Sequence, residues 1–78
     1  MKKFEVDHGG NAIIVENRAS GEKLFVNGEL QDERVGLSLV ARLFGQLPTG
    51  ENIKVSLGGI WTTQCRIFVD NKLVFPKK

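Results

Sequence analysis

Lys23–Leu30, with the sequence KLFVNGEL, returns later in the chain as Arg66–Leu73, with the sequence RIFVDNKL. Three of the eight positions are identical, and most of the others exchange one residue for a chemically close one. Each copy consists of an apolar run of β-forming residues, a two-residue turn signal and a return strand, which is typical of a β-hairpin. Asn27-Gly28 favours positive φ at both central turn positions, so the repeat predicts two related hairpins.

The rest of the chain also alternates between apolar β-forming runs and turn signals. Besides the hairpin at 22–31, we expect strands at 3–7, 12–16, 52–57, 61–69 and 72–75. Segment 34–47 fits both helical spacing and strict alternation of apolar residues. We predict that it is a strand, because Gly36 and Gly45 weaken a helix and no clear cap begins one.

This pattern predicts an all-β fold. We expect a small antiparallel β-sandwich, or a partly open barrel, of seven to eight short strands with two pseudo-repeated hairpins. At 78 residues the chain has room for one domain with one small core, and we assign residues 1–78 to it. The halves at about 12–30 and 53–73 read as related hairpin units within that domain.

Turn geometry also predicts which side chains share a face of each hairpin. In a two-residue hairpin Phe25 opposes Leu30, and in the second copy Phe68 opposes Leu73. We predict that these two pairs form the core. The opposite face is too apolar for plain exposure to solvent, so we expect another segment or another chain to cover it. Its apolar residues are Leu24, Val26, Ile67 and Val69.

The charged residues give little support for a nucleic-acid partner. The net charge is +2, and four of the eleven basic residues are terminal lysines, at positions 2, 3, 77 and 78. Acidic and basic residues between the termini nearly balance. A nucleic-acid site needs basic residues on one face with aromatic residues between them, and the terminal lysines would have to gather there. We therefore expect no nucleic-acid binding.

The cysteine content and the N-terminal sequence predict a cytoplasmic protein. Cys65 is the only cysteine, so an intrachain disulfide is excluded, which favours a reducing compartment. Acidic residues lie near the N-terminus, where a signal peptide needs an apolar run. No segment approaches the roughly 20 apolar residues that span a bilayer, so we expect no membrane segment.

No set of residues in the sequence predicts catalysis. His8 is the only histidine and lies beside Asp7, but one histidine is too few for a metal site, and a base also needs a positioned nucleophile. Cys65 lies in an apolar β-strand, where cysteine behaves as a small hydrophobe. We expect no enzymatic activity, no metal ion and no cofactor.

The acidic cluster of Glu29, Asp32 and Glu33 has two interpretations. Paired carboxylates serve hydrolysis in some enzymes. These three flank a turn and a strand edge, however, where charge also prevents edge-to-edge pairing of sheets. We predict the protective role.

Trp61 is the strongest candidate for a ligand contact. It follows two glycines and precedes three polar residues, a position from which its ring can stack on a sugar or on a partner side chain. The alternative is that this single tryptophan packs in the core. The candidate binding residues are Trp61, Thr62, Thr63, Gln64 and Asn52.

Several short motifs follow one another along most of the chain. They are Ser20-Gly21, Phe25-Val26-Asn27-Gly28-Glu29, Leu43-Phe44-Gly45, Ile53-Lys54-Val55 and Ile67-Phe68-Val69-Asp70-Asn71-Lys72-Leu73. In this order they resemble one of the two domains of the Fas apoptotic inhibitory molecule family. The resemblance implies a non-enzymatic β-sandwich that acts through protein contacts, and it carries over no catalytic residue.

The sequence as a whole predicts a small cytoplasmic β module that binds another protein or a second copy of itself. The hairpins are apolar on both faces, which favours association. The alternative is a module that binds a carbohydrate or another small ligand through Trp61 and the polar residues near it.

Overall fold

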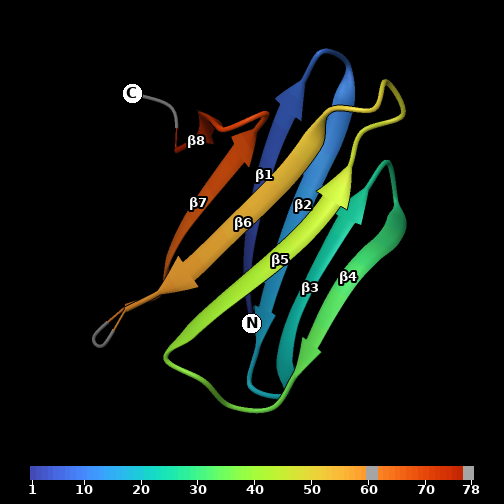
Figure 1. The fold of residues 1–78 in the computed structure, drawn as a ribbon. Coiled ribbons are helices and arrows are strands. Elements are labelled where there is room, and N and C mark those ends of the chain that lie inside the picture. The colour runs from blue at the N-terminus through green and yellow to red at the C-terminus, as the bar shows by residue number, and fades with distance from the viewer. Residues whose placement is uncertain (60–61, 77–78) are drawn as a thin grey trace.

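The computed structural model describes residues 1–59 and 62–76, and these residues form eight β-strands (Figure 1). The strands are β1 (Lys2–His8), β2 (Asn11–Arg18), β3 (Gly21–Val26), β4 (Glu29–Val35), β5 (Val40–Gln46), β6 (Asn52–Gly58), β7 (Gln64–Val69) and β8 (Lys72–Phe75). The described residues contain no helix, so the all-β prediction is confirmed. In particular, they include no long apolar helix able to cross a membrane.

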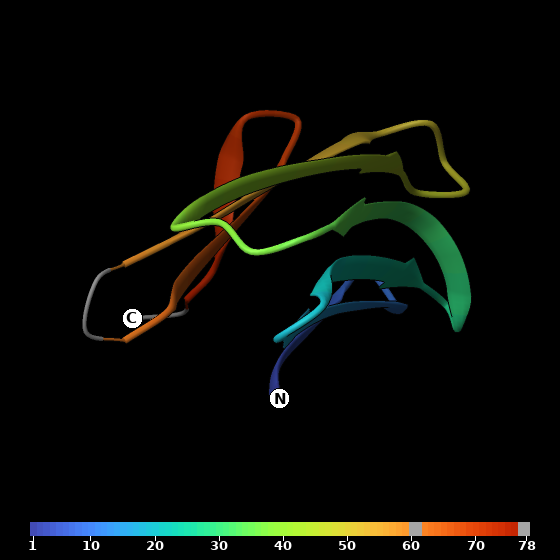
Figure 2. The ribbon, with the colours of Figure 1, turned by 90° about the horizontal axis from the view of Figure 1, so that it is seen from below.

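The strands form two antiparallel sheets that pack face to face as a sandwich. The N-terminal sheet has the order β1-β2-β3-β4, and the C-terminal sheet has the order β5-β6-β7-β8. Figure 2 shows the two layers, joined by the connection from β4 to β5. Both sheets are simple meanders, because each strand pairs with its neighbour in sequence. Buried residues from both sheets fill one common core.

The same turn occurs in both repeated hairpins. Asn27 and Asp70 have φ angles of 51° and 47°, and the residue after each also has positive φ, which is the type I′ conformation. In the first half, Ala12 N–H donates to Asn27 Oδ1 and Asn27 N–H donates to Ala12 O, both at 2.9 Å. In the second half, Asn52 and Asp70 form the same two bonds, at 2.9 and 2.8 Å. The halves therefore repeat in structure as well as in sequence.

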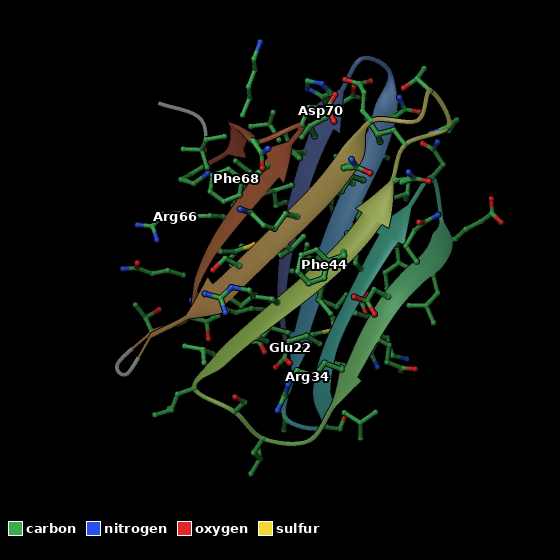
Figure 3. The ribbon with its side chains drawn as sticks, in the orientation of Figure 1. Glu22, Arg34, Phe44, Arg66, Phe68 and Asp70 are labelled. Carbon is green, nitrogen blue, oxygen red and sulfur yellow. The ribbon has the colours of Figure 1, made fainter. Side chains whose placement is uncertain are left out.

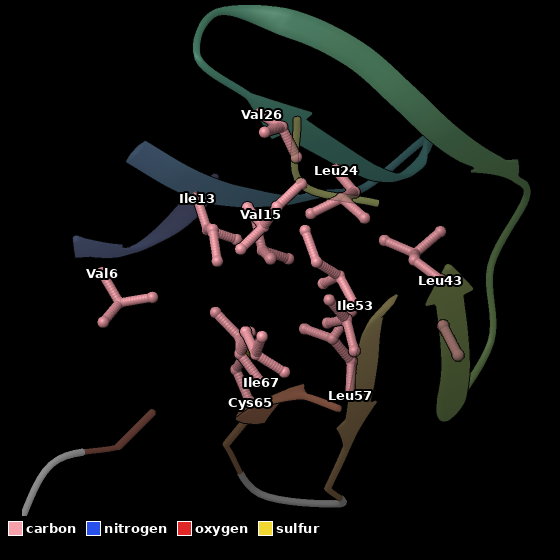
Figure 4. Packing of buried hydrophobic residues seen from close by; sticks show 14 residues of the cluster. Val6, Ile13, Val15, Leu24, Val26, Leu43, Ile53, Leu57, Cys65 and Ile67 are labelled. Carbon is pink, nitrogen blue, oxygen red and sulfur yellow. The ribbon is translucent and has the colours of Figure 1, made fainter. Parts of the chain in front are cut away.

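The core lies between the sheets and consists mainly of branched aliphatic residues (Figure 4). Leu24, Leu43 and Ile67 are completely shielded from solvent. The other buried apolar residues are Val6, Ile13, Val15, Val26, Ala41, Leu47, Ile53, Val55, Leu57, Cys65 and Val69. Because buried and more exposed residues alternate along the strands, each sheet has one inner and one outer face.

The prediction that the two Phe–Leu pairs form the core is wrong. Phe25 does oppose Leu30 and Phe68 does oppose Leu73, but both pairs lie on the outer faces of their sheets. Leu30 is 50% exposed and Leu73 is 46% exposed. The aliphatic face of each hairpin is instead the one that the opposite sheet covers.

The register between neighbouring strands explains which face is buried. β7 pairs with β6 so that Val69 lies opposite Ile53 and Ile67 lies opposite Val55. Cross-strand partners share a face, so the aliphatic residues of both strands combine into one apolar surface. Phe68, in contrast, lies opposite Lys54, whose charge is costly to bury without a partner. The sequence of the hairpin alone therefore does not predict which of its faces is buried, because that depends on the strand that pairs next to it.

Segment 34–47 contains the end of β4 and then β5, rather than one continuous strand. Residues 36–39 separate the two strands, and Gly36 in this connection has a φ of 107°. Leu37 and Leu39 are 85% and 69% exposed, although they continue the alternating apolar pattern. The prediction of β-structure is confirmed here, but the single strand is wrong, because the chain crosses from one sheet to the other.

Side chains of β4 close the outer edge of β5. Asp32 Oδ2 accepts a hydrogen bond from Phe44 N–H at 2.8 Å, and Gln31 Oε1 accepts one from Gln46 N–H at 3.2 Å. Gln31 can reach this edge because a bulge leaves it unpaired in β4 and because Gly45 has no side chain to obstruct it. Asp32 thus protects a strand edge by satisfying its backbone N–H as well as by its charge.

Candidate binding surfaces

The structure separates the residues that the sequence predicts to bind a ligand. Asn52 begins β6 and Gln64 begins β7, so they lie at opposite ends of the C-terminal sheet, about 20 Å apart at the usual rise along a strand. Asn52 Oδ1 accepts a hydrogen bond from Gln46 Nε2 at 3.1 Å, within the sheet. Trp61 lies outside the described residues. The rest of the set stays together near the start of β7.

Thr62 and Thr63 connect the two sheets at one end of the sandwich. Lys2 Nζ donates a hydrogen bond to Thr62 Oγ1, and Asn17 Nδ2 donates one to Thr63 Oγ1, both at 2.9 Å. These four residues line an open cleft of about 480 Å³, together with the β2–β3 turn and the β4–β5 connection. We call it the end cleft, and its volume suits a small ligand.

Glu22 lines the end cleft and is the one buried charged residue in the described part of the chain, at 5% exposure. Its Oε1 accepts a hydrogen bond from Arg34 Nη1 at 3.2 Å, and the same nitrogen donates to Gly36 O at 3.2 Å (Figure 3). A buried carboxylate needs such a partner, so this ion pair has a structural role. The alternation of Glu22 with Leu24 and Val26 is the sequence signal that places it on the inner face.

His8 and Cys65 do not form a catalytic pair. His8 ends β1, and its Nε2 lies 3.9 Å from Glu51 Oε2. Cys65 is buried near the start of β7, opposite Leu57, toward the other end of the sandwich. Burial raises the pKa of the Cys65 thiol to about 12, so little nucleophilic thiolate forms at neutral pH. Across residues 1–59 and 62–76, no group of His, Cys, Asp and Glu side chains is arranged to hold a metal ion.

The two halves of the chain differ in charge. Residues 1–36 contain seven acidic and five basic residues, whereas residues 37–78 contain two acidic and six basic residues. On the N-terminal sheet, the outer cations pair with carboxylates. These ion pairs are Lys3–Glu5 at 3.3 Å, Arg18–Glu16 at 2.6 Å and Lys23–Glu33 at 3.7 Å. The outer surface of this sheet is therefore largely neutralised.

The outer face of the C-terminal sheet carries basic residues that form no ion pair within the described residues. Arg42, Ser56 and Arg66 lie in register as one row across β5, β6 and β7. The next row contains Phe44, Lys54, Phe68 and Leu73. We define the basic face as Arg42, Phe44, Lys54, Arg66, Phe68 and Leu73, and Figure 3 labels three of these residues on it.

The pseudo-repeat supplies an internal comparison for the arginine row. The equivalent row of the N-terminal sheet is Lys3, Glu16, Lys23 and Glu33, in which basic and acidic residues alternate. Ser56 stands where that row has Glu16, and β8 ends before it reaches the position of Glu33. The C-terminal sheet therefore keeps both cations of the row but neither carboxylate.

The basic face combines this charge with exposed apolar surface. Phe44 is 55% exposed, and Val40, two residues before Arg42 on the same face of β5, is 66% exposed. Lys54 Nζ lies 4.9 Å from the centroid of the Phe68 ring, a cation–π contact. The sequence alone does not reveal this face, because its basic residues are far apart in the chain and become neighbours only through the strand register.

Comparison of this chain with protein families, with curated proteins and with solved structures finds no match. The resemblance to the Fas apoptotic inhibitory molecule family therefore stays a prediction.

Proposed function

We propose that this chain is a non-enzymatic binding module that acts by contact with another protein through the basic face. The observation that carries the proposal is the difference between equivalent rows of the two sheets. In the N-terminal sheet both cations of the row are paired, Lys3 with Glu5 and Lys23 with Glu33. Arg42 and Arg66, in contrast, flank a serine and form no ion pair in the described residues.

The composition of the basic face supports a protein interface. Arginine and aromatic residues are enriched among the residues that dominate binding energy at such interfaces. Phe44 and Val40 expose large apolar surfaces, whose burial by a partner is favourable. The resemblance to the Fas apoptotic inhibitory molecule family also implies a role through protein contacts.

A photocrosslinking amino acid placed on either outer face tests this proposal. One variant carries it at Phe44, and the control carries it at Leu30, which is similarly exposed on the opposite sheet. After irradiation of cells that make the protein, we expect a discrete protein adduct from position 44 that disappears when Arg66→Glu is added. Equal adducts from both positions, or none from position 44, contradict the proposal. An adduct of twice the chain mass identifies a second copy as the partner.

The end cleft supports a second candidate function, the binding of a carbohydrate or another small ligand. Thr62 and Thr63 line it, and polar groups from both sheets converge there. Backbone amide shifts recorded by NMR during titration with a panel of glycans test this candidate. Shifts confined to the threonines and Asn17 support it, and unchanged spectra throughout the panel exclude carbohydrate binding at the cleft.

A further inference from the structure

We infer that the partner of the basic face is an acidic segment of a different protein, which places carboxylates on Arg42 and Arg66 and an apolar side chain on Phe44. The inference rests on the proposed function and specifies the chemistry of the partner.

Arg42 and Arg66 are two anchor points of one row. Both lie in register with Ser56 on strands that are two apart, so their backbones are about 10 Å from each other at the usual strand spacing. A guanidinium group binds a carboxylate through two parallel hydrogen bonds, a geometry that lysine does not offer. The small side chain of Ser56 leaves the space between the arginines open to an incoming chain.

Phe44 lies next to this row and offers an apolar contact. It is two residues beyond Arg42 on β5, about 7 Å along the strand, and more than half of it is exposed. A partner segment that combines carboxylates with an apolar residue therefore meets both features at once. The apolar contact contributes affinity, and the arginines contribute selectivity and orientation.

A second copy of this chain does not supply the required charge. Two basic faces brought together would oppose Arg42, Lys54 and Arg66 to the same cations, and like charges repel. On the outer face of the N-terminal sheet, Glu5, Glu16 and Glu33 are already paired with cations of their own sheet, and Asp7 accepts a hydrogen bond from Gly10 N–H. The partner is therefore a different chain that brings unpaired carboxylates.

Nucleic acid fits the basic face less well than an acidic protein segment. Bases bind to sheet surfaces by stacking on exposed aromatic rings. Lys54 Nζ lies over the Phe68 ring and occupies its face, which leaves Phe44 as the open ring of this surface. Val40 and Leu73 are 66% and 46% exposed and add aliphatic surface, which complements apolar side chains.

Fluorescence anisotropy of labelled probes with the purified chain tests the inference. The probes are a short polyglutamate peptide with one central leucine, the same peptide with lysine in place of glutamate, and oligothymidylate. We expect the glutamate peptide to bind most tightly and to weaken as salt is added. The double variant Arg42→Glu, Arg66→Glu should bind it about thirtyfold more weakly, the loss of about 1 kcal/mol for each of two exposed ion pairs, and should now prefer the lysine peptide.

Two further variants separate the arginine row from general charge. Ser56→Glu introduces the carboxylate that Glu16 supplies in the equivalent row, and we expect it to weaken binding of the glutamate peptide while the circular dichroism spectrum stays unchanged. The control Lys3→Glu, Lys23→Glu changes the equivalent cations of the N-terminal sheet by the same total charge. We expect this control to bind the glutamate peptide like the unmodified chain, apart from a small long-range effect that salt removes.

The alternative outcomes have distinct meanings. Tighter binding of oligothymidylate than of the glutamate peptide overturns the inference in favour of nucleic acid. Dimers in sedimentation equilibrium that the double arginine variant loses overturn it in favour of a second copy. Equal binding of the glutamate peptide by the unmodified chain and the double variant also overturns it. In that last case, a protein adduct specific to position 44 still supports the proposed function, which is rejected if position 44 gives no adduct or gives the same adducts as position 30.

Discussion

Replacing one residue on each face of the second hairpin tests which face is buried. Ile67→Ala removes a fully buried side chain, and we expect the free energy of unfolding to fall by about 3 kcal/mol, from the lost transfer energy and the remaining cavity. Phe68→Ala, on the outer face, should cost less, about 1–2 kcal/mol, because the ring is only partly buried and its contacts are with neighbours on an open face, Lys54 among them. The larger side chain is thus expected to have the smaller effect.

Urea titrations followed by circular dichroism measure these differences. A chain of 78 residues has a total stability of about 4–12 kcal/mol, so Ile67→Ala stays folded over most of this range. Ile67→Val, with an expected loss of about 1 kcal/mol, is the milder variant if alanine unfolds the chain. In thermal melts a loss of 3 kcal/mol lowers the Tm by about 12–24 °C.

The first hairpin provides an independent repeat of the comparison. Leu24→Ala replaces the residue equivalent to Ile67, and Phe25→Ala replaces the residue equivalent to Phe68. We expect the same order of effects as in the second hairpin. If the two phenylalanine variants lose as much stability as the two aliphatic variants, the assignment of the core to the aliphatic faces is refuted.

Three further predictions concern single contacts. Asp32→Ala removes the acceptor of Phe44 N–H, so we expect the free energy of unfolding in urea titrations to fall by about 1–2 kcal/mol and light scattering to show edge-to-edge association. Asp32→Asn keeps an acceptor oxygen and should change both measurements less. Glu22→Ala leaves Arg34 without its carboxylate, and because Arg34 is 34% exposed we expect the free energy of unfolding to fall by about 1–3 kcal/mol. The double variant Glu22→Met, Arg34→Met removes both charges and should recover part of this loss. Burial raises the pKa of Cys65 from 9.0 to about 12, so the folded state holds the thiol proton more tightly than the unfolded chain does. Stability should therefore fall as the pH rises from about 9 to about 12, and Cys65→Ala should lack this part of the fall.

The turns and opposing pairs of the hairpins could be predicted because the information for them is local. Asn27-Gly28 and Asp70-Asn71 determine the turn type, and the opposing residues follow by counting from the turn. The buried face could not be found in this way, because it depends on which strand pairs next to the hairpin. Likewise, nothing in the alternation of 34–47 marks the crossing between sheets, since its apolar pattern continues through the connection.

The candidate surfaces could be predicted from the sequence only in part. Thr62 and Thr63 line a cleft, but the lysine and asparagine that bind them come from β1 and β2, far away in the chain. Arg42, Lys54 and Arg66 are separated by twelve residues each, so a net charge or a local window does not group them. They become one surface only when the register of three strands is known, and that register is a property of the folded sheet.

Comparison of the two halves of the repeat distinguishes features that the fold requires from features that only one sheet has. Features that recur in both halves, such as the aliphatic inner positions and the side chain that closes each turn, are those on which the sandwich depends. The outer rows do not recur in charge. Since Glu16 occupies the position equivalent to Ser56, β-structure tolerates a carboxylate between two cations there. The architecture therefore does not require the unneutralised arginines, and the anionic partner that we propose would supply the missing counter-charge.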